Sequence, residues 1–243
     1  MNETSLFRIW VFLASSPLLW LTVTVLVYLG ALWLHRLSGR HSLVNPALVS
    51  VAALVCVLLL TGTPYPTYFD GAKFVHFLIG PATVALAVPL YGQLERLKRM
   101  WLPIGVALLV GSATAIASAV GIGYLLGASR ETLLSLAPKS ATLPIAMAVA
   151  EGIGGVPPLA AMAVAATGIG GAIIATPFLN LLGFRDAAVR GFAVGITAHA
   201  IGTARALQVG TVNGAFAALA LALNGVATAL LVPLLLKVLG PLL

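Results

Sequence analysis

A lysine, two hydroxyl residues, a proline and a glutamate stand close together in a stretch that otherwise avoids charge. This stretch, residues 138–155, reads PKSATLPIAMAVAEGIGG, and in it Lys139 is followed by Ser140 and, twelve positions on from the lysine, by Glu151. Charged side chains are costly in a bilayer and are usually functional there. The apolar run between them, 143–150, covers at about 1.5 Å per residue less than half of a roughly 30 Å hydrocarbon core. We therefore predict an aborted helix that does not cross a membrane by itself.

The start of this short helix has the features of an anion site. Pro144 breaks the preceding run and fits a first helical turn, where a missing N–H costs nothing, and Thr142 can cap that turn. The free backbone amides of Ile145 and Ala146 would then face the ammonium group of Lys139. These donors, with the neighbouring hydroxyl groups at the positive end of a helix, predict a seat for a small carboxylate.

The composition identifies the class of protein. The 243 residues are 60% hydrophobic and 8% charged, with a mean hydropathy of +1.09, whereas soluble proteins average about 25% charged residues. We expect one integral membrane domain, residues 1–243, with no soluble module. The net charge of +7 comes mostly from bases in short segments between apolar runs, which the positive-inside bias explains better than nucleic-acid binding does. The single cysteine, Cys56, can form no intrachain disulfide.

Seven apolar segments are predicted to cross the membrane. They are Pro17–Leu34, Val44–Leu60, Lys73–Tyr91, Trp101–Leu126, Pro157–Leu182, Gly191–Leu207 and Asn213–Leu239. With the short helix they predict an all-α polytopic fold. Basic clusters at 35–41 and 95–99 predict cytoplasmic connections. Arg185 and Arg190 join them on that face if the short helix re-enters and leave it if the helix crosses, so the charge rule favours re-entry.

Two of the crossing segments carry predicted interruptions. Gly80-Pro81 falls in the middle of the third segment, where a proline removes a helix hydrogen bond and predicts a kink or a break. Thr83, just after it, would cap a second broken helix. Gly195 and Gly202 interrupt the sixth segment.

The order of the elements is repeated. An apolar span, a charged turn, a broken polar stretch and another apolar span describe residues 44–126 and again 157–239, linked by 127–156. With re-entry the two halves have opposite orientation. This predicts an inverted repeat whose broken helices meet at the midplane, as in many secondary carriers.

A second polar group occupies the sixth segment. Arg205 keeps its proton, so at membrane depth it needs a partner, a watery cavity or a bound anion; it either grips a carboxylate or ends a helix at the interface. His199 and Thr203, four positions apart, share a helix face. The histidine either serves the substrate and its proton or is structural. A break near Gly202 would bring all three together.

Other charged residues also have two interpretations. Lys139 either binds an anion in a cavity or extends its ammonium group to the membrane interface. Glu151 is a proton-coupling carboxyl, paired or protonated because it ends a helix, or an exposed loop acid. Asp70, Lys73 and His76 form a polar stripe at a helix start; they pair with one another or contribute to a gate.

Three strings carry a resemblance to a known family. They are FDGAKFVHFLIGPATVALAVPLY, PKSATLPIAMAVAEGIGGVPPLAAMAVAATGIGGA and GFAVGITAHAIGTARAL. Together they resemble the LrgB/CidB family of bacterial inner-membrane proteins, over nearly the whole chain from Pro17 onward. The matching motif residues are Gly80, Pro81, Thr83, Lys139, Ser140, Thr142, Pro144, Glu151, His199, Gly202, Thr203 and Arg205. Ala141 and Leu143 stand where relatives often have other small or β-branched residues.

The resemblance implies two functions. Members of the family were first described as holin-like or antiholin-like regulators of murein hydrolase activity and lysis, encoded beside a smaller LrgA/CidA-type membrane protein. The plant plastid relative carries glycolate and glycerate, and bacterial pairs have been linked to pyruvate uptake. The resemblance thus implies a multi-pass protein of the bacterial cytoplasmic (inner) membrane. We also expect a homo-oligomer and an LrgA/CidA-type partner.

Between these functions, the interrupted segments and intramembrane charges favour a secondary transporter of small monocarboxylates, coupled to protons. The alternative is the antiholin-like regulator. The sequence contains no His-Glu-x-x-His pair, no Gly-x-Ser-x-Gly elbow, no phosphate loop and no paired aspartates at metal spacing. We therefore expect no enzyme, no cofactor and no metal site.

Overall fold

The computed structural model describes residues 16–39, 41 and 43–239 of the chain. Arg40, part of the predicted cytoplasmic connection at 35–41, lies outside the described residues. The described chain consists of helices and the turns between them, without a strand. The prediction of an all-α fold is therefore confirmed.

Five helices among the described residues are long and apolar enough to cross a membrane. They are Pro17–Leu37, Tyr65–Tyr91, Trp101–Leu125, Pro157–Leu181 and Thr211–Lys237. The chain is thus a polytopic membrane protein. The two other predicted crossing segments correspond to a shorter apolar helix, Pro46–Thr61, and to a more polar helix, Ala187–Val209. That these two also cross stays a prediction.

The chain divides into two compact units, Met1–Ala85 and Leu86–Leu243. The boundary falls inside the first predicted repeat half, 44–126, so the units do not coincide with the two halves. The inverted repeat and the single membrane domain stay predictions.

The first unit is built on a helix that packs against two others. Its helices are α2 (Pro17–Leu37), α3 (Pro46–Thr61), α4 (Tyr65–Phe77) and α5 (Ile79–Ala85), and α2 contacts both α3 and α4. Trp20 of α2 is fully buried, with its ring edge-on to Tyr68 of α4 at 5.9 Å between centroids. Gly71 permits this close crossing, because a Cβ there would lie 2.7 Å from the Cβ of Trp20.

Prolines interrupt the third predicted segment twice. Its helices are α4, α5 and, in the second unit, α6 (Ala87–Tyr91), with turns at Leu78 and Leu86. Pro81 and Pro89 lack the N–H groups that would bond the carbonyls of Phe77 and Ala85, four residues earlier, and α4 and α5 end at those two residues. The first interruption was predicted from Gly80-Pro81, whereas the second was not.

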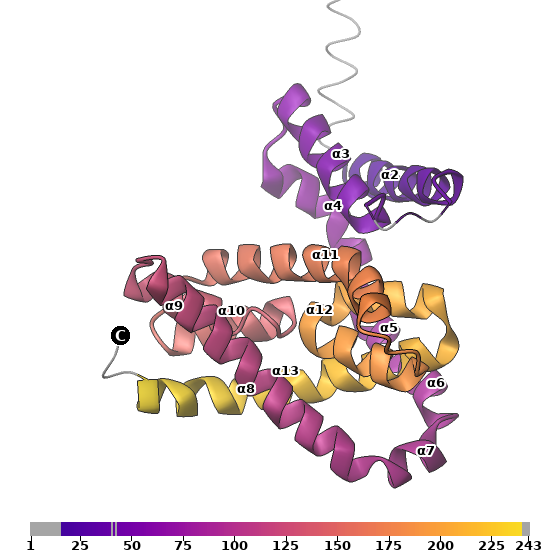
Figure 1. The fold of residues 1–243 in the computed structure, drawn as a ribbon. Helices are drawn as coiled ribbons and strands as arrows, with labels where there is room; N and C mark the ends of the chain where they lie inside the picture. The colour runs from indigo at the N-terminus through magenta and orange to yellow at the C-terminus, as the bar shows by residue number, and fades with distance from the viewer. Residues whose placement is uncertain (1–15, 40, 42, 240–243) are drawn as a thin grey trace, which may run out of the picture. The chain divides into compact units, whose positions relative to one another are not determined.

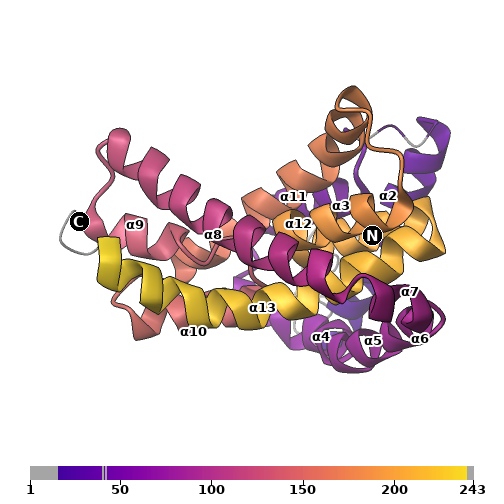
Figure 2. The ribbon, with the colours of Figure 1, turned by 60° about the horizontal axis from the view of Figure 1, so that its bottom comes forward.

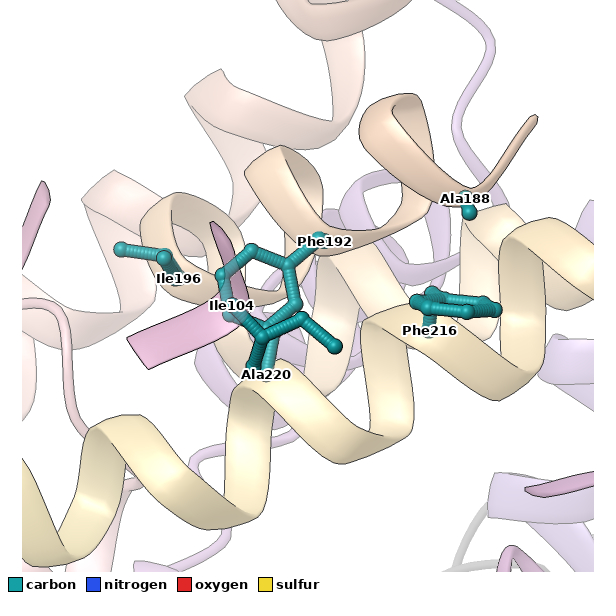
Figure 3. Close-up of a cluster of buried hydrophobic side chains, with 6 residues drawn as sticks. All are labelled: Ile104, Ala188, Phe192, Ile196, Phe216 and Ala220. Carbon is teal, nitrogen blue, oxygen red and sulfur yellow. The ribbon is translucent and has the colours of Figure 1, made fainter. Parts of the chain in front are cut away.

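The second unit contains α6, α7 (Leu94–Arg99), α8 (Trp101–Leu125), α9 (Arg130–Leu136), α10 (Leu143–Gly152), α11 (Pro157–Leu181), α12 (Ala187–Val209) and α13 (Thr211–Leu239). Within it, α12 lies beside both α11 and α13, and α8 packs on α13 (Figures 1 and 2). Figure 3 shows a buried cluster where α8, α12 and α13 meet. Its largest side chains are Ile104, Phe192, Ile196 and Phe216.

Glycines set the close approach of α12 to α13. A Cβ on Gly191 would meet the carbonyl oxygen of Asn213, and one on Gly195 would meet that of Ala217. In membranes small residues at such crossings let two backbones approach and gain van der Waals contact. The four-residue spacing of Gly191 and Gly195 puts both on the face of α12 that packs on α13.

The interruption of α12 is not at the glycines where we predicted it. The helix continues through Gly195 and Gly202, and its backbone departs from helical geometry at His199, between them. Gly202 instead provides space, since a Cβ there would lie 2.5 Å from the Cβ of Ala198. The prediction that Gly195 breaks the helix is therefore corrected, since Gly195 packs on α13, whereas the departure at His199 lies three residues from Gly202, near the break predicted there.

Gly195→Ala is expected to destabilise the protein by about 1–3 kcal/mol, because the added methyl group overpacks the α12–α13 crossing. Thermal unfolding in detergent should show a lower Tm. Gly170→Ala in α11 is the matched control, since nothing lies within 4 Å of a Cβ at that position. Equal Tm values for the two variants would contradict the close crossing.

Candidate functional site

The segment between α9 and α11 begins and ends beside the same residue, Ser135 of α9. The backbone N–H of Val156, just before α11, donates a 2.8 Å hydrogen bond to the hydroxyl of Ser135 in α9. A Cβ on Gly155 would lie 3.0 Å from the backbone nitrogen of Ser135. α10, within this excursion, has ten residues, which is about 15 Å and half of a bilayer core. An excursion that returns to its start has the geometry expected of a re-entrant segment.

The start of α10 offers fewer donors than predicted. Thr142 occupies the N-cap position with an extended backbone, and Pro144 is the second helical residue, but the Thr142 hydroxyl makes no capping hydrogen bond. The Thr142 carbonyl accepts the N–H of Ala146 at 2.8 Å. The amide of Ala146 closes the first helical turn and does not face a ligand, so of the predicted pair only Ile145 is left as a candidate donor.

Lys139 and Ser140 line a cavity of about 710 Å³ in the second unit. The other walls come from α8, α11, α12 and α13. The lysine is half-buried, and its Nζ donates a 3.4 Å hydrogen bond to the Ser140 hydroxyl, a neutral partner. Among the described residues that line the cavity, Lys139 has the only charged side chain. A cation that faces a cavity of ligand size with mainly apolar walls is suited to bind an anion.

Asn224 of α13, which the sequence analysis did not single out, fixes the position of Ser140. Its side-chain nitrogen donates to the carbonyls of Ser140 and of Ile196 in α12, at 2.8 and 3.2 Å. Its side-chain oxygen accepts the hydroxyl of Ser112 in α8 at 2.6 Å. The asparagine is 1% exposed. The signal in the sequence was an amide side chain inside a crossing segment, where polar residues are costly.

His199 lies at the kink in α12. Its backbone has φ 39° and ψ −131°, and it is the only non-glycine residue with a positive φ in the described part of the chain. Such a conformation costs about 1–3 kcal/mol. Ring atom Nε2 is 2.9 Å from the carbonyl of Val164 in α11, and because a carbonyl only accepts, Nε2 carries the proton. The Thr203 hydroxyl donates to the His199 carbonyl at 2.8 Å. Both predicted residues are thus buried and bonded to backbone.

Arg205 lies in a different place from Lys139. It lines a second cavity of about 20 Å³, with Arg190 and Asn213 among the neighbours, and its Nη1 donates to the side chain of Gln208 at 3.2 Å. Because Lys139 and Arg205 line separate cavities, the structure does not bring them together around one carboxylate.

Glu151 is exposed in the last turn of α10. It forms no salt bridge with any residue that the structure describes. The pairing predicted for it is therefore not formed, and its position fits the alternative of an exposed acid. The described residues also contain no group of three or more His, Cys, Asp or Glu side chains that could hold a metal ion.

The polar stripe of the first unit agrees with the interpretation in which its residues pair with one another. Asp70 and Lys73 form an exposed 3.1 Å ion pair. The ring of His76 is edge-on to Phe69, with 6.0 Å between centroids. The side chain of Thr83 lies outside the described residues, so its predicted cap stays a prediction.

An ion pair between α7 and the start of α12 lies beside Phe216, a residue of the cavity lining. Nη2 of Arg96 in α7 donates to Oδ2 of Asp186 at 2.6 Å, and the guanidinium lies 5.5 Å from the ring centre of Phe216, which lines the cavity. Oδ1 of Asp186 caps α12 by accepting the N–H groups of Ala188 and Val189 at 2.9 and 3.0 Å. One carboxylate therefore both caps α12 and ties it to α7.

The electrostatics keep this carboxylate ionised. The Val189 N–H, and with it the Arg96 guanidinium and the Ala188 N–H, lower the pKa of Asp186 below its ordinary value against the opposing effect of burial. A depressed folded-state pKa contributes stability above the unfolded-state value of about 3.9 and loses it as the pH falls further. The pair therefore stays charged at neutral and mildly acidic pH.

Asn224→Ala is expected to destabilise the protein by about 1–3 kcal/mol, because two buried carbonyls and a hydroxyl lose their partner. It should also increase the mobility of the Lys139 segment. Tm measurements and hydrogen exchange of residues 137–142 check both effects. Val226→Ala, an exposed position of the same helix, is the control. Unchanged exchange at 137–142 would show that Asn224 does not position this segment.

Two substitutions at Asp186 separate its cap from its ion pair. Asp186→Asn keeps a good helix cap and loses the charge, whereas Asp186→Ala also loses the cap, which is worth about 1 kcal/mol. The alanine variant should therefore have the lower Tm. Acidification from pH 5 to pH 3 should remove stability from the wild type that the asparagine variant lacks already. Identical acid profiles for these two proteins would contradict the role of the ionised carboxylate.

The sequence and the fold were compared with protein families and with solved structures. No solved structure matches the chain. The sequence model of the LrgB-like family matches residues 24–238, which include the segment between α9 and α11, the kink of α12 and the helices that line the cavity. The chain belongs to the LrgB-like family.

Proposed function

We propose that this protein is a secondary carrier of small monocarboxylates, of the size of glycolate, glycerate, lactate or pyruvate. The observation that carries the proposal is the single cation of the 710 Å³ cavity, Lys139. Its only described hydrogen-bond partner is a neutral hydroxyl. A bound carboxylate would supply the missing counter-charge, and a charge-assisted hydrogen bond is roughly twice as strong as a neutral one.

One cation selects for one negative charge. A dicarboxylate would place its second carboxylate against walls that are mainly apolar, where an unpaired charge is very costly. Ser140 adds a hydroxyl beside the ammonium, so a carboxylate with a neighbouring hydroxyl or keto oxygen would find a second polar partner. Arg205 and Glu151 have no part in this site, because they lie elsewhere.

Proton coupling is a further part of the proposal. His199 is a titratable side chain at the kink of α12. A carrier needs such an interrupted helix to change its conformation. The ring of His199 bonds α11 while its own helix forms walls of the cavity. A carrier can open its site alternately to the two sides of the membrane by moving its broken helices relative to the rest of the bundle. Uptake driven by an inward proton gradient, and lost in its absence, tests the coupling.

We place this activity in the cytoplasmic membrane of a bacterium, and propose a carrier rather than an enzyme. The antiholin-like role rests on the family alone, and no contact among the described residues favours it. A homo-oligomer or an LrgA/CidA-type partner is not needed for the proposed binding step, so the purified chain is the first protein to test.

Lys139→Ala should reduce uptake of labelled pyruvate and glycolate into proteoliposomes by about 10-fold to 100-fold, because a hydrogen bond to a charged group is worth about 1.5–3 kcal/mol. Lys139→Arg should retain part of the activity. Lys98→Ala, an exposed lysine of α7, is the control for loss of a positive charge. Each variant is compared at equal reconstituted amount.

Wild-type rates in Lys139→Ala would disprove the proposed site. Release of a large trapped dye by the wild-type protein, without selectivity for small anions, would favour the pore-forming alternative over a carrier.

A further inference from the structure

The cavity that contains Lys139 has a polar end and an apolar end. One end is lined by Met100, just before α8, and by Pro103, Ile104 and Ala107 of α8; Gly111 follows, and the hydroxyl residues Thr114 and Ser118 line the other end together with Ala115. At about 1.5 Å per residue, the lining from residue 100 to residue 118 extends roughly 27 Å along the helix. The hydroxyl groups are therefore confined to one part of a long cavity.

The same gradient is found on α12, and contacts align the two helices. Ile104 and Phe192 belong to one buried cluster, which marks the apolar level (Figure 3). The Ser112 hydroxyl and the backbone carbonyl of Ile196, the last residue of α12 in that cluster, bind Asn224, which marks the level where the apolar end stops. From Phe192 the lining of α12 continues to Thr197, so both helices change from apolar to polar in the same direction.

Lys139 belongs to the polar end. Its neighbour Ser140 is held by the same asparagine that binds Ser112 and Ile196. Thr167 of α11 and Thr197 of α12 also line the cavity. The opposite end is formed by Ile104, Phe192 and Phe216, and beyond Phe216 lies the guanidinium of Arg96.

We propose that the cavity takes monocarboxylates that have an apolar tail, with the carboxylate at Lys139 and the tail between α8, α12 and Phe216. This inference rests on the proposed function and extends its substrate class to acids whose apolar tails are longer than those of glycolate or pyruvate. Acids of two or three carbons would leave the apolar end without a partner. A tail gains about 25 cal/mol for each Å² of apolar surface that it buries, whereas added hydroxyls would lose their water there. The tail can come from a free acid in water or from a fatty acid in the bilayer.

The test is a chain-length series on the wild-type protein. Calorimetric titration of the full chain in nanodiscs, with empty nanodiscs as blank, compares propanoate, butanoate, pentanoate and hexanoate near pH 7.5. We expect Kd to fall about fourfold for each added methylene, the ratio that corresponds to burial of one CH₂ group. Succinate, with the carbon count of butanoate, should bind at least 10-fold more weakly. Binding is measured because neutral forms of longer acids cross bilayers unaided.

Two variants locate the tail. Ala107→Phe fills the apolar end and should remove the gain in affinity from added methylenes. Ala117→Phe, an exposed position of α8 outside the cavity lining, should behave like wild type. Loading nanodiscs with palmitate beforehand distinguishes the two sources, since a bilayer fatty acid would compete with hexanoate.

The outcomes separate the two proposals. A flat series in which propanoate and glycolate bind as tightly as hexanoate, and Lys139→Gln weakens all of them, would overturn the tail and leave the carrier standing. Binding of succinate as tightly as butanoate would also overturn the tail. If no monocarboxylate binds, or if Lys139→Gln binds them like wild type, the proposed function fails and the tail fails with it.

Discussion

The side chain of Asn224 holds together the part of the protein in which the cavity lies. An asparagine has one oxygen and one NH₂ group to satisfy, and here both are used on three different segments: Ser112 of α8, Ile196 of α12 and Ser140 of the re-entrant loop. Inside a bilayer no water can replace these partners. A change in the position of any one segment would therefore leave a buried polar group unsatisfied. The depth of Lys139 follows from this constraint, because Lys139 precedes the residue that Asn224 binds.

Close packing of small residues makes the asparagine contact possible. Gly191 and Gly195 bring α12 against the backbone of α13, and Gly168 brings α11 against the ring of His199. The helix pairs are then near enough for side-chain amides and rings to reach carbonyls across them. The backbone strain at His199 is held by two hydrogen bonds, one from its ring to Val164 of α11 and one from the Thr203 hydroxyl within α12. Packing in this unit thus determines where the polar groups can meet.

The sequence predicted elements whose causes are local. Apolar length located most of the long apolar helices to within a few residues, although the third begins at Tyr65, eight residues before its predicted start. Prolines and short apolar length located the breaks at Pro81 and α10, because a missing N–H acts within one helical turn. Gly195 misled us at α12: it suggested a break, but a glycine can equally serve close contact, and only the neighbouring helix decides which. Asn224 and the separation of Arg205 from Lys139 depend on contacts between distant segments. No periodicity within one segment contains that information.

The lone ammonium of the cavity also constrains what movement is possible. Lys139 faces mainly apolar walls and a neutral hydroxyl, so the empty site has a charge without a counterion, which is unfavourable in a medium of low dielectric constant. A monocarboxylate in the site makes the loaded cavity neutral, and a neutral complex loses less free energy when the surrounding helices rearrange in a bilayer. A second anion would restore the imbalance with the opposite sign. In the proposed carrier, the electrostatic cost of the lysine therefore makes the neutral state, with one monocarboxylate bound, the favoured one to move. A wide water-filled pore would solvate the lysine in every state and would have no such preference.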